Sequence, residues 1–141
     1  RNKVDPALVA GLIRQESMFD SRALSRAGAR GLMQLMPEVA RPAARAAGIE
    51  AWNDDLLNDP SLNLKLGVQH LAGLLKDYDD LPRVLAAYNA GRRRADQWSG
   101  YPGAKDPEVF TEWIPFDETR GYIMAIQRNV ELYRALYLWP G

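Results

Sequence analysis

The sequence predicts a mainly helical fold with a single domain over residues 1–141. Apolar residues recur at three- and four-residue steps, Asp–Pro pairs that favour helix starts stand at 5–6 and 59–60, and no stretch shows the alternation of a strand. A chain of 141 residues, 47% of them hydrophobic, can form one compact core. The abrupt opening RNKVDP favours a domain excised from a longer protein.

The first helix is expected over residues 5–17. Asp5 is a good N-cap, and Pro6 fits the first helical position, where a missing N–H costs nothing. At about 100° per residue, the apolar side chains span an arc of roughly 140°, with Glu16 near its middle and Ala7 outside it. The arc consists of Leu8, Val9, Leu12 and Ile13. The Glu16 carboxyl group is therefore expected to face the core.

Glu16 is the first candidate for chemistry. A carboxylate in an apolar wall is costly unless it is hydrogen-bonded, paired or protonated, and burial raises its pKa. A carboxylic acid that is neutral at working pH can donate a proton, as the general acid does in glycoside cleavage. The alternatives are a structural ion pair with Arg30 or Arg120, or exposure at a frayed helix end.

A loop and a second helix are expected next. Residues 18–30 are polar and irregular, and residues 31–37 form an apolar turn. A helix should follow over 37–47 and end at Gly48. Pro42 lies inside it and is expected to kink or restart it.

A longer core helix is expected after a loop over residues 49–58. It begins at 59–60 and runs to about residue 78. Gly67 and Gly73 each weaken it relative to alanine, which suggests close packing of another backbone. Its packed face is predicted to consist of Leu64, Val68, Leu71, Leu75 and Tyr78.

The last third of the chain predicts two short helices between two longer ones. A helix capped by Asp80 should end at Gly91, and residues 92–103 suggest a short helix and a loop. Another short helix over 107–113 precedes a break, and a long helix capped by Asp117 follows. The long helix is predicted to pack through Tyr122, Ile126, Val130, Tyr133 and Tyr137.

Composition excludes several classes of function. The 18 basic and 18 acidic residues cancel, so no overall field favours nucleic acid or an anionic membrane. Cysteine is absent and His70 is the one histidine, which leaves no thiolate or paired-histidine metal motif. The basic run at 92–94 is most simply a solvated face. No apolar run is long enough to span a bilayer, and the first residues do not resemble a signal peptide.

Further polar residues have both structural and functional interpretations. Gln34 is the only strongly polar side chain in its apolar turn. It is either an exposed residue or a group that forms a hydrogen bond with a sugar, with Met36 beside it as an adaptable apolar contact. Tyr88 and Asn89 place a phenol and an amide at a helix end, where the phenol is by default a core aromatic. Glu118 in a first helical turn is favoured by the helix dipole without any functional role.

Four segments, in this order, carry a family resemblance. They are the helix ending at 16–17, GARGLMQLMP at 28–37, AYNAG at 87–91 and IPFDETRGYI at 114–123; DPSLNLKLGVQHL at 59–71 adds to them. Together they resemble the catalytic domain of soluble lytic transglycosylases, a lysozyme-like family related to goose-type lysozyme. The resemblance implies a mainly α, lysozyme-like single domain with a glycan-binding cleft.

The resemblance also implies site residues. Glu16 matches the family's catalytic acid and base. The matching substrate-binding residues are Ser25, Gln34, Met36, Tyr88, Asn89 and Glu118. Among them, Ser25 and Tyr88 correspond to hydroxyl groups at the catalytic centre, and Glu118 to the glutamate of the ETR motif. The chain departs from the family after AYNAG, where residues 92–94 are arginines at the edge that contacts anionic stem peptides.

The implied activity is cleavage of the β-1,4 bond between N-acetylmuramic acid and N-acetylglucosamine in peptidoglycan, forming 1,6-anhydromuramyl products. One glutamate acts as acid and then as base, with no metal or other cofactor. The implied partners are glycan strands, with other cell-wall enzymes as candidates and no nucleic acid. The expected compartment, periplasm or cell envelope, follows from that substrate, and the chain is expected to be a monomer.

Other functions stay open at this point. A hydrolytic muramidase would use the same acid with water as nucleophile, and Asp20, Asp54 or Asp55 could orient that water. A non-catalytic peptidoglycan-binding module would use only the groove and its aromatic residues, but it would have little reason to bury Glu16. A helical protein-interaction module would explain the helices but not the polar residues.

Overall fold

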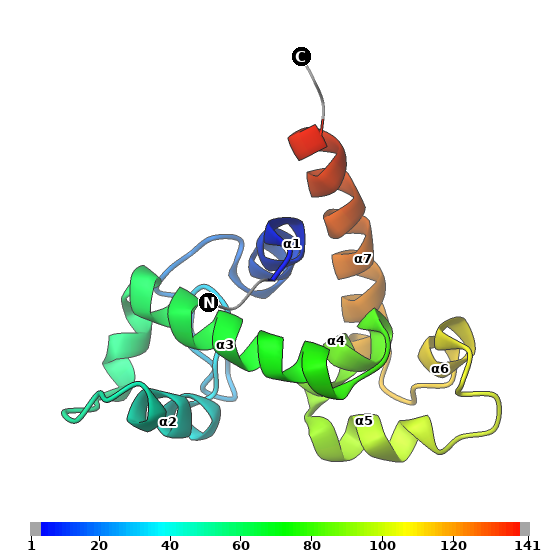
Figure 1. Ribbon diagram of the computed structural model, residues 1–141, viewed down its shortest axis with the longest axis horizontal. Helices are drawn as coiled ribbons and strands as arrows, with labels where there is room; N and C mark the ends of the chain where they lie inside the picture. Colours follow the sequence, from blue (N-terminus) through cyan, green and yellow to red (C-terminus); the bar gives the residue numbers. More distant parts are fainter. Residues whose placement is uncertain (1–3, 139–141) are drawn as a thin grey trace.

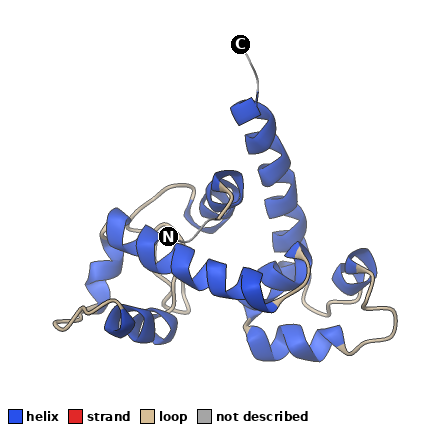
Figure 2. Ribbon diagram, viewed as in Figure 1, coloured by secondary structure: helices blue, strands red, loops and turns tan. Residues whose placement is uncertain are grey.

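The computed structural model describes residues 4–138, and the mainly helical prediction is confirmed (Figures 1 and 2). Its elements are α1 (Pro6–Ser17), α2 (Pro37–Ala46), the 3₁₀ helix η1 (Asp54–Asn58), α3 (Pro60–Asp77), α4 (Leu81–Ala90), α5 (Arg92–Ser99), α6 (Pro107–Glu112) and α7 (Asp117–Leu138). No strand occurs within the described range. Two isolated antiparallel bridges, Leu24 with Arg30 and Arg30 with Leu35, fold the segment between α1 and α2 back on itself.

Aspartate side chains cap four of the helices, as their positions predict. Asp5 accepts a hydrogen bond from the Ala7 N–H at 2.9 Å, and Asp59, Asp80 and Asp106 cap α3, α4 and α6 in the same way. Each of these helices also has proline in its first two positions. These caps satisfy N–H groups that the helix leaves without partners, so local sequence fixes these helix starts.

Three details of the expected helices differ in the structure. Helix α2 continues through Pro42 without restarting; Pro42 and Glu38 are both exposed, so water can bond to the Glu38 carbonyl that Pro42 leaves without a backbone partner. The expected loop 49–58 contains η1, whose start Asn53 caps by accepting from the Asp55 N–H at 2.9 Å. Asp117 is the first residue of α7 rather than its cap.

The packed face of α3 is rotated from the predicted one. Leu64 and Leu75 are 38% and 36% exposed. The buried residues are Asn63, Leu66, Gly67, Leu71 and Leu74. Gly67 explains the rotation, because a Cβ there would lie 2.3 Å from the sulfur of Met33. A close contact at Gly67 is thus confirmed, but its partner is the side chain of Met33 and not another backbone; at Gly73 the nearest atom is 3.9 Å away, so close packing there is wrong.

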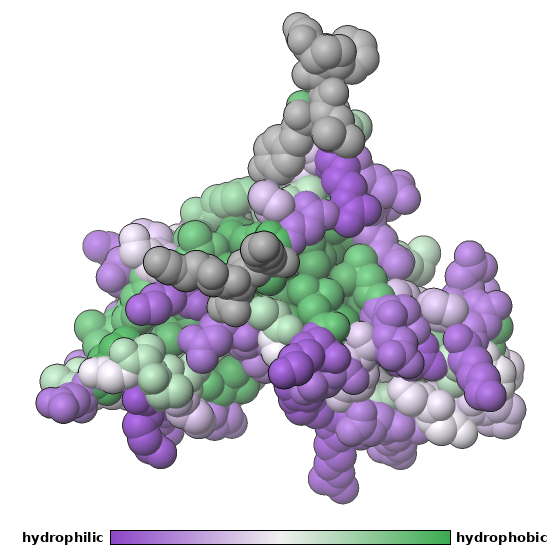
Figure 3. All heavy atoms as spheres, viewed as in Figure 1, coloured by the Kyte–Doolittle hydropathy of each residue, from purple (hydrophilic) through white to green (hydrophobic). Residues whose placement is uncertain are grey.

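Helices α1 and α7 make the most extensive helix pair of the fold, and α7 extends beyond the rest of the molecule (Figure 1). A Cβ at Gly11 would lie 3.2 Å from Cγ2 of Val130, so the two helices approach closely there. Ala7 is 1% exposed, which corrects its expected position outside the buried arc. Figure 3 shows apolar residues gathered in the middle of one face, with hydrophilic residues around its edge.

The predicted packed face of α7 is confirmed within the described side chains. Tyr122, Ile126 and Val130 are buried, and Tyr133 packs against the core while partly exposed. Tyr137, also predicted there, has a side chain outside the described part of the structure. The side of α7 that faces α1 is therefore the side that reaches Glu16.

Candidate active site

Glu16 lies in the last turn of α1 and is half-buried. The hydroxyl group of Tyr122, from α7, donates a hydrogen bond to its Oε2 at 2.7 Å. Close packing at Gly11 brings α1 and α7 together. The carboxyl group and the phenol can therefore form a hydrogen bond although they are far apart in the sequence. The sequence identified Tyr122 only as a core residue, although its place on the face toward α1 is the signal that could have predicted this contact.

Burial raises the pKa of Glu16 from an ordinary 4.5 to about 7, and the negative charge of Glu118 adds to the shift. The hydrogen bond from Tyr122 acts in the opposite direction, because it stabilises the carboxylate. The side chain can therefore be a protonated acid near neutral pH and can also hold the negative charge after it gives up its proton. Both states are needed by a group that acts as acid and then base.

The ion-pair alternative for Glu16 is not what the structure shows. Arg30 pairs with Asp55 at 3.0 Å. Arg120 donates to the Asp117 carboxylate and to the Ile114 carbonyl. Both arginines are thus held by other partners, and the raised pKa of Glu16 agrees with a carboxyl group that lacks a cationic neighbour.

The loop over residues 30–36 is tied to the helices around Glu16. The hydroxyl group of Ser17 donates to the Leu32 carbonyl at 2.7 Å, directly beside the acid. The hydroxyl group of Tyr88 donates to the Met33 carbonyl at 2.7 Å, and its ring centroid lies 5.3 Å from that of His70. Burial is the main cause that raises the pKa of the Tyr88 phenol, and the negative charge of Glu16 raises it further. Tyr88 therefore lies near the acid.

Asn63 is the buried support of this loop and was missed by the sequence analysis. It is 0% exposed. Its Oδ1 accepts from the Met33 N–H at 2.8 Å, while its Nδ2 donates to the carbonyls of Arg30 and Leu57, each at 2.9 Å. Gly31, at φ +80°, leaves room for the Asn63 side chain, because a Cβ at Gly31 would lie 2.2 Å from that Nδ2. The available signal was the position of Asn63 four residues before Gly67, which places both on the same face of α3.

The polar groups of Ser25 and Gln34 bond to the loop's own backbone. Ser25 Oγ accepts from the Ala29 N–H at 2.9 Å. Gln34 has φ +49°, and its Nε2 donates to the carbonyls of Ala23 and Gly31, each at 3.0 Å. Met36 follows directly as the residue before α2, half-buried. Gln34 and Met36 thus lie on the loop that Ser17, Tyr88 and Asn63 hold in place, whereas Ser25 lies in the segment that precedes it.

A pocket of about 320 Å³ brings Asn89 and Glu118 together. The Thr119 hydroxyl group, 1% exposed, donates to Asn89 Oδ1 at 2.7 Å and joins the end of α4 to the start of α7. Arg94 also lines this pocket, with its guanidinium 4.8 Å from the centroid of Phe116. Arg92 instead pairs with Asp77 at 2.7 Å, and all three arginines of the run are exposed, which agrees with the predicted solvated face.

The aspartates considered for a hydrolytic reaction are held elsewhere. Asp54 bonds to Arg41 at 2.9 Å and to the indole of Trp52 at 2.7 Å. Asp55 is the partner of Arg30, and Asp20 accepts from the Arg22 N–H in its own turn. Within the described residues, no group of three His, Cys, Asp or Glu side chains could hold a metal ion, and no helix is long and apolar enough to cross a membrane.

Fold and site together define a helical domain with a half-buried glutamic acid, Glu16, at the contact between α1 and α7. The family model for the transglycosylase SLT domain matches residues 1–111, and the chain belongs to this family. Helix α7, which supplies Tyr122 and Glu118, follows the matched residues.

Known relatives extend the match over nearly the whole chain. The soluble lytic murein transglycosylase of Escherichia coli K12 is 34% identical over 139 residues, which cover 96% of this chain and 21% of the relative. The crystal structure of the 70 kDa soluble lytic transglycosylase of Escherichia coli superposes with a TM-score of 0.86 at 30% identity, covering 97% of this chain and 23% of that one. This chain thus spans about a fifth of the relative's length, and it shares the lysozyme-like all-α fold.

A second solved structure is similar in the same way. It is the lytic transglycosylase Slt of Pseudomonas aeruginosa, an inactive mutant with glutamine in place of a glutamate. The TM-score is 0.88 at 33% identity, covering 99% of this chain and 23% of that one.

Proposed function

We propose that this chain cleaves the β-1,4 bond between N-acetylmuramic acid and N-acetylglucosamine in peptidoglycan without water, leaving a 1,6-anhydromuramyl end. The observation that carries the proposal is the environment of Glu16, a carboxyl group with a pKa of about 7 and a phenol on its Oε2. Membership of the transglycosylase SLT family and the names of the murein transglycosylase relatives support the choice of substrate and reaction.

The first step is proton transfer from Glu16 to the glycosidic oxygen. The bond from that oxygen to the anomeric carbon of the muramyl sugar breaks, and the 2-acetamido oxygen of the same sugar supports the cationic carbon. This substrate assistance takes the place of the second carboxylate that ordinary glycosidases use. The Tyr122 hydroxyl group stabilises the carboxylate that Glu16 becomes, since its hydrogen bond favours the ionised form.

In the second step, the Glu16 carboxylate takes the proton from the C6 hydroxyl group of the muramyl sugar. The C6 oxygen bonds to the anomeric carbon and closes the 1,6-anhydro ring, which returns Glu16 to its protonated state. No water is consumed, so the site must hold the C6 hydroxyl group closer to the anomeric carbon than any solvent molecule. No step uses a metal ion or another cofactor.

The remaining residues are proposed to bind the glycan. Ser25, from the segment before the tethered loop, presents a polar group, and Gln34 and Met36 present polar and adaptable apolar groups from the loop itself, where Tyr88 fixes the Met33 carbonyl. Asn89 and Glu118 share one pocket and bind a further part of the saccharide. Hydrogen bonds to the backbone hold Ser25 and Gln34 in position before the substrate arrives, which lowers the entropy cost of binding.

The proposal also sets the context of the domain. Residues 1–141 form one catalytic domain of a longer protein, working as a monomer on glycan strands in the periplasm or cell envelope. Relatives named as soluble and as membrane-bound murein transglycosylases support that compartment. Other cell-wall enzymes are its candidate protein partners.

Mass spectrometry of the products tests the reaction. Purified peptidoglycan is incubated with the protein and, in parallel, with Glu16→Gln. Muropeptides with 1,6-anhydro ends, lighter by one water than hydrolysis products and absent with the variant, are the expected result. Reducing ends that depend on Glu16 would identify a hydrolytic muramidase, and sedimentation with the wall without any product would identify a binding module.

A further inference from the structure

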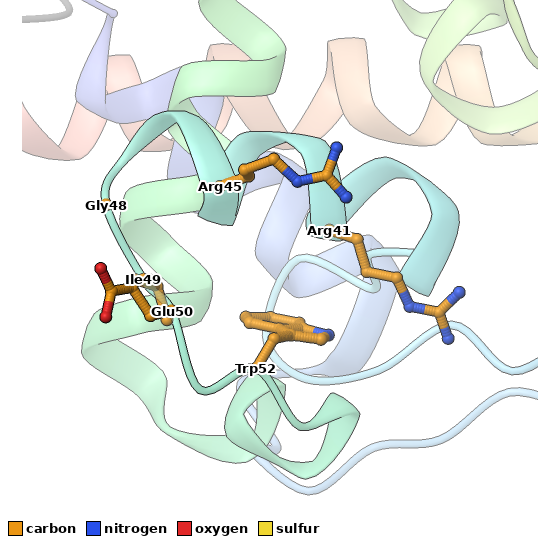
Figure 4. Close-up of a pocket in the computed structure, with 6 residues that line it drawn as sticks. All are labelled: Arg41, Arg45, Gly48, Ile49, Glu50 and Trp52. Atoms are coloured by element: carbon orange, nitrogen blue, oxygen red, sulfur yellow. The ribbon is translucent and has the colours of Figure 1, made fainter.

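A second cavity lies between α2 and the segment that leads into η1 (Figure 4). Its volume is about 610 Å³, within the range typical of small-molecule sites. It is lined by Arg41, Arg45, Gly48, Ile49, Glu50 and Trp52. None of these residues is among those that surround Glu16, and the proposed reaction uses none of them.

The indole of Trp52 is fixed in the wall of this cavity. Its Nε1 donates to Oδ1 of Asp54 at 2.7 Å. The same carboxylate accepts from Arg41 at 2.9 and 3.3 Å, and these contacts hold the pKa of Asp54 below its usual range. The half-buried indole therefore cannot rotate without breaking this chain of bonds, which makes it a preorganised aromatic surface.

Arg45 provides a charge that the fold does not use. It lies one helical turn after Arg41 on α2, is exposed, and has no acidic partner among the described residues. Glu50 is also unpaired within the described range, but Figure 4 shows its carboxylate pointing away from the two guanidinium groups. The cavity thus combines an apolar ring surface with one available guanidinium group.

We propose that this cavity binds a sugar ring that carries a carboxylate substituent. The apolar face of the ring lies on the indole of Trp52, and Arg45 forms a charge-assisted hydrogen bond with the carboxylate. A polyanion is disfavoured because Asp54 neutralises Arg41, which leaves Arg45 as the one available guanidinium group and room for a single negative group. The natural ligand is an acidic muramyl unit of the glycan strand, an assignment that rests on the proposed function.

Such a site would hold the domain on its substrate by a contact separate from the Glu16 site. A second contact with the same strand raises the effective concentration of the glycan at the first one. The domain could then stay on the wall between cleavage events.

Titration of the tryptophan indole N–H signals by NMR tests the proposal. The chain has 4 tryptophans, and Trp52→Phe identifies the signal of Trp52 by its disappearance. The probes are N-acetylmuramic acid, which carries a carboxylate, and N-acetylglucosamine, which does not. We expect both to shift the Trp52 signal, with the acidic sugar binding at least about threefold more tightly.

Arg45→Gln should remove that preference while the weaker binding of N-acetylglucosamine remains. Arg128→Gln, at an exposed arginine on α7, is the matched control and should leave the preference unchanged. A Trp52 signal that neither sugar moves, or a preference that survives Arg45→Gln, would overturn the proposal. Because the titration measures no cleavage, its outcome is independent of whether the products carry anhydro ends.

Discussion

The hydroxyl group of Tyr122 lies 2.7 Å from Oε2 of Glu16, across 106 residues of sequence. The helix that carries Tyr122 acts on the pKa of Glu16 in two opposed directions. Docking of α7 buries Glu16 and raises its pKa, while the phenol that α7 brings lowers it. The balance, at about 7, decides at which pH Glu16 can donate its proton.

Glu16→Gln should abolish cleavage and preserve the fold. An amide of the same shape can accept the Tyr122 hydrogen bond but cannot transfer a proton, so kcat should fall by at least about a hundredfold. Release of soluble muropeptides measures the loss, and circular dichroism checks the fold. Glu131→Gln, an exposed position on α7, should retain activity. Near-normal turnover of Glu16→Gln would show that another group is the acid.

Glu16 should make the free energy of unfolding depend on pH. Its pKa is about 7 when folded and 4.5 ordinarily, so the folded state binds the proton more tightly. The resulting stability is fully present below pH 4.5 and is lost as the pH rises to about 7. The loss is on the order of 3 kcal/mol. Urea unfolding at both ends of this window should show it, and Glu16→Gln should remove it. An equal pH dependence in that variant would assign the effect to other groups.

Tyr122→Phe should move the pH dependence of activity upward. For the parent chain, kcat/KM should fall as the pH rises through about 7, because the free enzyme needs a protonated Glu16. The phenol lowers that pKa, so its removal should shift the midpoint to higher pH and reduce the maximal rate. A pH–rate profile measures both. Tyr101→Phe, in the loop after α5, should leave the midpoint in place, and an unshifted Tyr122→Phe profile would contradict the assigned contact.

Asn63→Ala should destabilise the domain by about 2–4 kcal/mol, because it leaves one N–H and two carbonyl groups without their partner. Urea unfolding with an unchanged m-value measures this loss. Asn129→Ala is the control, since its one bond, to the Gly11 carbonyl, is long at 3.3 Å. Equal midpoints for the two variants would show that Asn63 does not hold the loop.

Local chemistry made the helix starts and the acid predictable from sequence. The Asp–Pro signals act within one turn, so Asp5 and Asp59 could be assigned as caps without knowing the fold. Glu16 followed from the 3.6-residue period of its own helix, and the structure places it half-buried with a raised pKa.

Contacts between distant segments limited the rest of the prediction. The buried face of α3 depends on Met33 packing against Gly67; the glycine itself suggested a close contact, but nothing within α3 identifies Met33 as the partner or shows which way the helix is turned. Asn63 was not predicted to be buried, because its three partners come from two other segments. The substrate-binding roles of Ser25, Gln34, Met36, Tyr88, Asn89 and Glu118 came from family resemblance, and they stay predictions until binding is measured.

The pairing of the first and last helices has a consequence for biosynthesis. A ribosome completes α1 long before it adds Tyr122, so a nascent chain carries Glu16 in a solvated state with an ordinary carboxyl pKa. Glu16 gains its contact with Tyr122 and its raised pKa only when α7 has been made and has docked. On the proposed function, a chain synthesised only as far as α6 is therefore expected to be inactive.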